Sequence, residues 1–117
     1  MKIVNIFAVA FCLWVFSNTS LAHTAIKISN IENGAILAFS PAAFEFSFSA
    51  NVGLAALELQ MQGDNPVSLE YDSPTTMRKE FSAPLPELRP GAYIIRWRAV
   101  ANDGHVMRGE ISFVITN

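Results

Sequence analysis

The sequence predicts an all-β fold, an antiparallel β-sandwich of about seven short strands. Apolar and polar residues alternate with a period of two over most of the chain after residue 22, a pattern typical of strands with one buried face. Turn-forming residues such as Gly, Pro, Asn and Asp separate the alternating segments. No segment there carries apolar residues at helical spacing over a useful length, so we expect one domain built from strands alone.

The first half of this domain contains three alternating segments. In residues 26–29 the isoleucines share one face, and Asn33-Gly34 then marks a turn. Residues 44–48 alternate three phenylalanines with polar residues, which is the clearest strand pattern of the chain. Residues 57–61 alternate again, and we expect a further strand there.

The middle of the domain contains weaker patterns and more turn residues. Residues 67–71 form a further alternating set, and residues 72–75 interrupt the chain. A short strand is expected at residues 77–81. Residues 83–90 carry three prolines, which predicts an irregular connection. Its end, Pro90-Gly91, fits the central positions of a type II turn.

The C-terminal part predicts two strands joined by a turn. In residues 93–99 the side chains of Tyr, Ile, Trp and Ala share one face, and residues 111–115 repeat the alternation with Ile, Phe and Ile. We expect Trp97 to pack in the core among its apolar neighbours. Residues 102–105, Asn-Asp-Gly-His, form the connection.

The N-terminal segment, residues 1–22, is typical of a secretory signal peptide. Lys2 supplies the positive charge, residues 3–16 are apolar without a charge, and residues 20–22 form a small-x-small cleavage signal. The apolar run is too short to span a bilayer comfortably. We therefore expect cleavage after Ala22, export to the periplasm, and a mature domain of residues 23–117 that begins with His23.

The composition of residues 23–117 excludes several functions. Without Lys2 the domain keeps seven basic residues against ten acidic ones, which argues against nucleic acid as a partner. It contains no cysteine, so disulfides, thiolate metal sites and cysteine nucleophiles are excluded. Beyond the candidate metal ligands, no other histidine-and-acid pair is available to complete a hydrolase triad with a serine. We therefore expect no enzymatic activity.

Only two histidines occur in the chain, and each stands where it could bind a metal. As a new N-terminus, His23 would offer its α-amine and its imidazole, a chelating pair that suits Cu(II). Asp103 and His105 could add a carboxylate and a second imidazole. Three nitrogens and one oxygen favour Cu(II) over Mg²⁺ or Ca²⁺, and affinity should fall as pH falls because the nitrogen donors become protonated.

Each half of this metal hypothesis also has a simpler explanation. Asp-Gly is a favoured two-residue hairpin turn, so residues 103–105 alone are explained by turn formation. A histidine at a new N-terminus can be an accident of processing. The spacing leaves open whether the N-terminus and the Asp103–His105 turn lie at the same end of the sandwich.

These residues resemble the periplasmic copper-resistance CopC family over essentially the whole mature domain. Shared markers are the leader that ends in Ala22-His23, the segment Asn33-Gly34-Ala35-Ile36-Leu37 with Ser40-Pro41, and Phe46-Ser47-Phe48-Ser49. The most specific markers follow in order, namely Gly91-Ala92-Tyr93, Arg96-Trp97-Arg98, Asp103-Gly104-His105, Gly109 and Phe113.

The resemblance implies an Ig-like β-sandwich or barrel with Greek-key connections that binds one Cu(II) per chain through His23, Asp103 and His105. It implies a role in copper buffering, transport or resistance, with an inner-membrane copper transporter or another periplasmic copper protein as partner. We expect a monomer. Two departures are notable: Ala50 stands where many relatives carry Glu, and Val106 follows His105 where Pro is usual.

Two other functions compete with this hypothesis. The first is a copper-dependent oxidative enzyme with a histidine brace, which also uses an N-terminal histidine. The second is a metal-free Ig-like interaction module in which both histidines are incidental. Some members of the family also bind Cu(I) through clustered methionines, but this domain has only Met61, Met77 and Met107 and no third histidine, so we expect no such site.

Overall fold

The computed structural model describes residues 26–72 and 76–117, so the expected leader and His23 lie outside the described residues. This part of the chain is all-β, as the sequence predicts, and it contains no helix. It therefore has no helix that could cross a membrane. Its strands are β1 (Ile26–Ser29), β2 (Ala35–Leu37), β3 (Ala43–Met61), β4 (Val67–Ser68), β5 (Arg78–Pro84), β6 (Gly91–Ala101) and β7 (Val106–Ile115).

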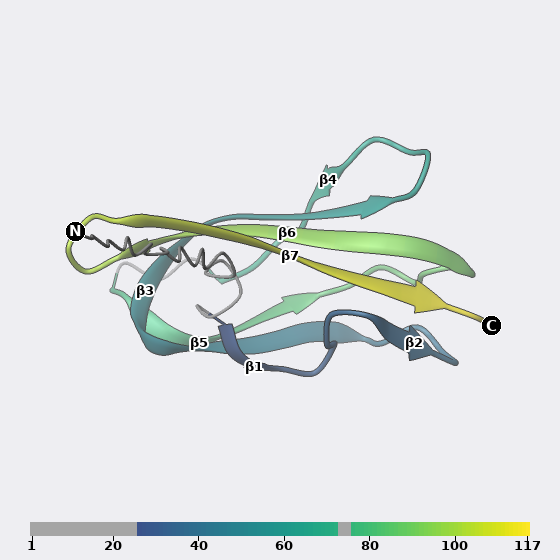
Figure 1. The fold of residues 1–117 in the computed structure, drawn as a ribbon, viewed down its shortest axis with the longest axis horizontal. Helices are drawn as coiled ribbons and strands as arrows, with labels where there is room; N and C mark the ends of the chain where they lie inside the picture. The colour runs from purple at the N-terminus through teal and green to yellow at the C-terminus, as the bar shows by residue number, and fades with distance from the viewer. Residues whose placement is uncertain (1–25, 73–75) are drawn as a thin grey trace, which may run out of the picture.

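These strands form one sheet, curled into a half-barrel, in the order β1-β3-β6-β7-β2, with β4 and β5 also paired to β3 (Figure 1). Pairing is antiparallel between the described strands, except that β2 runs parallel to β7. The expectation of a purely antiparallel sheet is wrong at this edge. β2 and β7 are not joined by a hairpin. At the turn before β2, the Gly34 N–H donates to the Ser112 carbonyl of β7, and the Asn33 Oδ1 accepts a hydrogen bond from the Ser112 N–H.

Residues 44–48 and 57–61, expected to form separate strands, belong to one strand of 19 residues, β3. Figure 1 shows β3 running along one layer, bending, and returning along the other layer beside β6. The pairing register shifts between Ser47 and Val52 and again between Leu54 and Ala56. Such irregularities bend a strand and increase its twist, so β3 pairs with β1 and β5 before the bend and mainly with β6 after it.

Aromatic rings fill the space between the two halves of the curled sheet. Phe44, Phe46 and Phe48 are all buried, as their alternation predicts. The Phe46 ring stacks on Phe81 of β5 at 5.6 Å between centroids, and Phe48 meets Trp97 edge-on at 5.3 Å. Trp97 is 4 % exposed, which confirms its predicted core position. Contacts of this geometry add to the stabilisation from apolar burial.

The middle of the domain departs from the predicted boundaries. β4 ends at Ser68, so the alternation of residues 67–71 does not continue as a strand, although Leu69 is buried. The strand expected at residues 77–81 is confirmed as β5, which runs on to Pro84. Gly91 has φ 156° and begins β6, whereas a type II turn requires a φ near about +80° at this position. The expected type II turn is therefore wrong.

Gly109 on β7 leaves the space that the Trp97 ring occupies. The two residues are directly opposed on β6 and β7. A Cβ at position 109 would lie 2.5 Å from Cζ2 and 2.7 Å from Nε1 of Trp97. Those distances are too short for any real contact, and the indole is held in place by Phe48.

We therefore predict that Gly109→Ala lowers the free energy of unfolding by about 1–3 kcal/mol, the usual cost of overpacking. Gly53→Ala is the matched control, because a Cβ at this strand glycine meets only the Val100 carbonyl oxygen, at 4.0 Å. Urea unfolding followed by tryptophan fluorescence measures both variants. Equal stability of the two would contradict the close packing of Trp97 on Gly109.

Candidate metal centre

The Asp103–His105 turn stands at the end of a long two-stranded ladder. β6 and β7 pair from Gly91 opposite Ile115 to Val100 opposite Val106. One face of the ladder is buried throughout, through residues such as Ile95 and Phe113. A turn at the end of a ladder this regular is presented on a rigid support.

Hydrogen bonds define the shape of this turn. The Gly104 N–H donates to the Ala101 carbonyl at 2.9 Å, and the Ala101 N–H donates to the His105 carbonyl at 2.8 Å. Gly104 has φ 88°. This combination is typical of a three-residue hairpin loop, a type I turn followed by a left-handed residue. Asn102 and Asp103 are its central residues, so the plain two-residue Asp-Gly turn considered from the sequence is wrong.

Asp103 is held by its own turn. Its Oδ1 accepts a hydrogen bond from the backbone N–H of His105 at 3.0 Å, which leaves Oδ2 available. Both side chains are exposed, and the His105 ring forms no hydrogen bond with any described residue. The structure thus brings together two of the three predicted ligands, a carboxylate and an imidazole two residues apart, at one exposed tip.

A pocket of about 330 Å³ adjoins Asp103 and is closed on its other side by the bend of β3. This arises because Val52, at the end of the bend, pairs with Ala101 at the base of the turn. The pocket is lined by Phe48, Ser49, Ala50, Asn51, Val52, Ala101, Asn102, Asp103 and Met107. Sequence reasoning did not place Ser49 and Asn51 beside this turn, since only the strand register brings them there.

The start of β1 pairs with a residue that lines this pocket. Ile26 pairs with Phe48, and β1 runs antiparallel to β3. From Ile26 to Ser29, β1 therefore runs away from the segment of β3 between Phe48 and Asn51. For the described residues, β1 begins opposite Phe48, one of the residues that line the pocket beside Asp103; whether the N-terminus reaches the turn stays a prediction.

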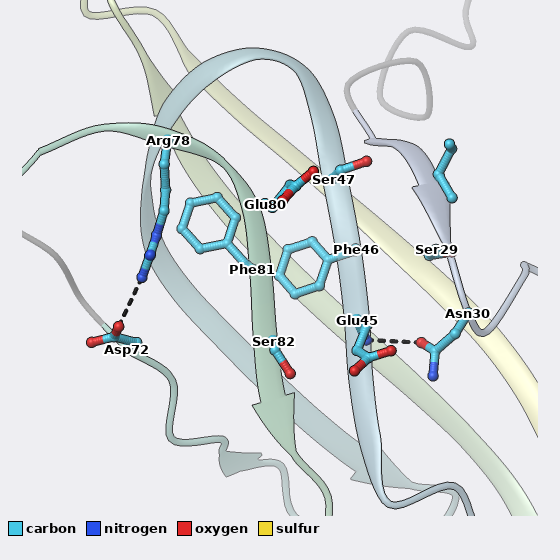
Figure 2. A pocket seen from close by; sticks show the side chains of 11 residues that line it. Ser29, Asn30, Glu45, Phe46, Ser47, Asp72, Arg78, Glu80, Phe81 and Ser82 are labelled. Carbon is cyan, nitrogen blue, oxygen red and sulfur yellow. Dashed lines mark hydrogen bonds and ion pairs between the residues drawn. The ribbon is translucent and has the colours of Figure 1, made fainter.

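No group of three or more His, Cys, Asp or Glu side chains suited to a metal occurs within residues 26–72 and 76–117. Another hollow, of about 590 Å³, lies over β1, β3 and β5 (Figure 2). Neither this hollow nor the smaller pocket is lined by a histidine, and Arg78 in the larger hollow is already paired with Asp72 at 2.9 Å. The smaller pocket is the candidate metal centre because Asp103 lines it and His105, outside its lining, lies two residues further along the same turn.

Comparisons with known proteins agree with this architecture. A family model described as the CopC domain matches residues 26–116. The structure of CopC from Methylosinus trichosporium OB3b superposes with a TM-score of 0.66 at 19% identity, covering 78% of this chain and 91% of that one. No curated protein sequence matches significantly.

A second solved structure is PcoC from Escherichia coli, described as a methionine-rich copper resistance protein. It superposes with a TM-score of 0.58 at 25% identity and covers 78% of this chain and 96% of that one. The CopC structure, at lower identity, supports the fold alone, and the family match carries the assignment of the domain.

Gly104 is the residue that the turn geometry constrains most. We predict that Gly104→Ala lowers the free energy of unfolding by about 1 kcal/mol, because a Cβ is unfavourable at this positive φ. Gly104→Asn should cost less, since Asn tolerates the left-handed region. Amide exchange of Ala101 and Gly104 would report the loosened turn. Equal protection in the wild type and the Ala variant would contradict the left-handed geometry.

Proposed function

This chain belongs to the CopC domain family, and from this premise we propose that it is a periplasmic copper-binding protein that acts in copper buffering, transport or resistance. Its single Cu(II) site would combine the N-terminal His23 of the mature protein with Asp103 and His105. The observation that carries the proposal is that Asp103 and His105 share one ordered turn, beside a pocket that also includes Phe48, the residue opposite the start of β1.

His23 lies only a short way along the chain from the start of β1. Two residues, Thr24 and Ala25, lie between His23 and Ile26, and the three chain steps span at most about 11 Å when extended. From Ile26 onward, β1 runs away from the part of β3 that lines the pocket beside Asp103. The reach and the direction together support a ligand from the N-terminus.

The donor set suits Cu(II). Cleavage between Ala22 and His23 would free an α-amine, which together with the His23 imidazole forms a chelate. His105 would add a third nitrogen and Asp103 an oxygen, and tetragonal nitrogen and oxygen donors are the preference of Cu(II). The PcoC relative, described as a copper resistance protein, supports the same cargo.

The proposed role is binding and transfer of copper without catalysis. Signal-peptide cleavage would place the mature domain in the periplasm as a monomer. An inner-membrane copper transporter or another periplasmic copper protein would exchange copper with it. An exposed hairpin tip, reachable from solvent on several sides, fits an ion that must be handed on.

The N-terminal chelate can be tested with one added residue. A protein that begins at His23 should bind Cu(II) tightly, while one with a glycine before His23 should lose at least about tenfold in affinity, because its former amine is in a peptide bond. Competition titration and EPR spectra measure this change. The matched control carries the extra glycine after Asn117 and should bind like the parent; equal binding by all three proteins would refute the chelate.

The role of Asp103 can be separated from its role in the turn. Asp103→Asn keeps an oxygen that accepts the His105 N–H but removes the charge, whereas Asp103→Ala removes both. If the carboxylate binds copper, both variants should weaken Cu(II) binding by about tenfold or more. Wild-type affinity in Asp103→Asn, with loss only in Asp103→Ala, would show that Asp103 orients the turn and does not ligate the metal.

A further inference from the structure

Arginines gather on the outer face of the β6–β7 ladder, which faces away from the core. Arg96, Arg98 and Arg108 line one groove of about 600 Å³. They are three of the eight basic residues of a chain whose net charge is −2. The groove also contains Glu58 and Glu110, so its arginines exceed its carboxylates by one, on a chain that is acidic overall.

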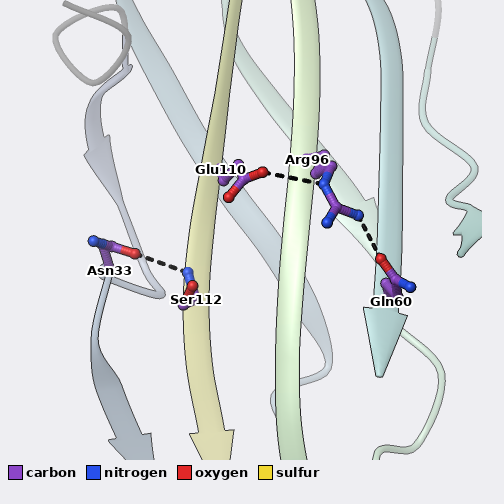
Figure 3. Close-up of polar contacts among 5 residues, drawn as sticks. All are labelled: Asn33, Gln60, Arg96, Glu110 and Ser112. Carbon is purple, nitrogen blue, oxygen red and sulfur yellow. Dashed lines mark hydrogen bonds and ion pairs between the residues drawn. The ribbon is translucent and has the colours of Figure 1, made fainter. Parts of the chain in front are cut away.

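Arg96 is already occupied by partners within the fold. Its Nε donates to Glu110 at 3.2 Å, and one of its terminal nitrogens donates to the Gln60 side chain at 2.6 Å (Figure 3). This guanidinium is fixed across β3, β6 and β7. Its charge is balanced locally and does not call for an external ligand.

Arg98 and Arg108, unlike Arg96, form no ion pair among the described residues. They are directly opposed across the ladder and both exposed. On the neighbouring strand β3, the residue beside Arg98 is Ala56. Like charges directly opposed in a sheet are destabilising, so this pair costs stability that an external anion would restore.

We propose that Arg98 and Arg108 form a docking site for an acidic segment of a partner protein. Guanidinium groups bind carboxylates through paired hydrogen bonds, and two adjacent ones can hold successive acidic side chains. Val106, 48 % exposed, lies next to the pair and opposite Val100. An apolar contact beside two cations favours a peptide segment over a free anion.

The site lies on the two strands that end in the Asp103–His105 turn. Arg98 and Arg108 face outward, while Met107 and Ala101 line the pocket on the other side of the same ladder. A partner bound to the arginines would therefore sit beside the hairpin tip without covering the pocket. The docking site does not depend on the copper ligands, so it can be tested in the absence of copper.

The test is an NMR titration of the protein beginning at His23, with hexaglutamate as the probe and hexaglutamine as its uncharged control. Hexaglutamate should shift the amide signals of residues 96–100 and 106–110, and hexaglutamine should not. Arg98→Gln/Arg108→Gln should weaken binding by at least about tenfold. Lys79→Gln/Arg89→Gln removes two exposed charges elsewhere and should bind within about twofold of the wild type.

Three results would overturn the proposal. The first is equal weakening in the two double variants, which would indicate net charge alone. The second is sulfate producing the same shifts as hexaglutamate at equal charge concentration, which would indicate a free anion. The third is loss of binding to phosphatidylglycerol vesicles in Arg98→Gln/Arg108→Gln while hexaglutamate does not bind, which would assign the face to lipid.

Discussion

The bend of β3 is the constraint on which the rest of the structure depends. One strand, Ala43–Met61, supplies a pairing edge to β1 and β5 before the bend and to β6 after it. Its alternate residues are buried on both sides of the bend, as in Phe44 and Leu57. Because the same strand belongs to both layers, the core aromatic rings and the position of the β6–β7 turn are fixed relative to one another.

Much of the fold could be predicted from the sequence because burial in a sheet has a period of two. The faces of residues 44–48, 93–99 and 111–115 are buried as the alternation indicates. The continuity of β3 could not be predicted, since Ser49, Ala50 and Asn51 interrupt the apolar pattern at the bend. The parallel pairing of β2 with β7 also could not be predicted from the sequence, because its contacts, such as Asn33 with Ser112, join residues 79 positions apart.

The sequence predicts only the part of the candidate site whose residues are neighbours along the chain. Asp103 and His105 stand two residues apart, so their joint presentation follows from one turn. Ser49 and Asn51 come beside them through the register that sets Val52 against Ala101. A register is determined by the packing of whole strands, and single residues carry no signal of it. The contribution of His23 depends on cleavage of the leader and stays a prediction.

The proposed copper site and the arginine pair place charge on the two faces of the same hairpin. Asp103 is the one carboxylate among the residues that line the pocket, and Ala50 there has no charge. In the proposed site, Cu(II) held by neutral nitrogens and this single carboxylate would keep positive charge at the tip. The outer face of the same strands already carries Arg98 and Arg108. Copper loading would then extend one positive surface around the tip, and since complementary charge steers association, an acidic partner would meet the loaded protein faster than the empty one.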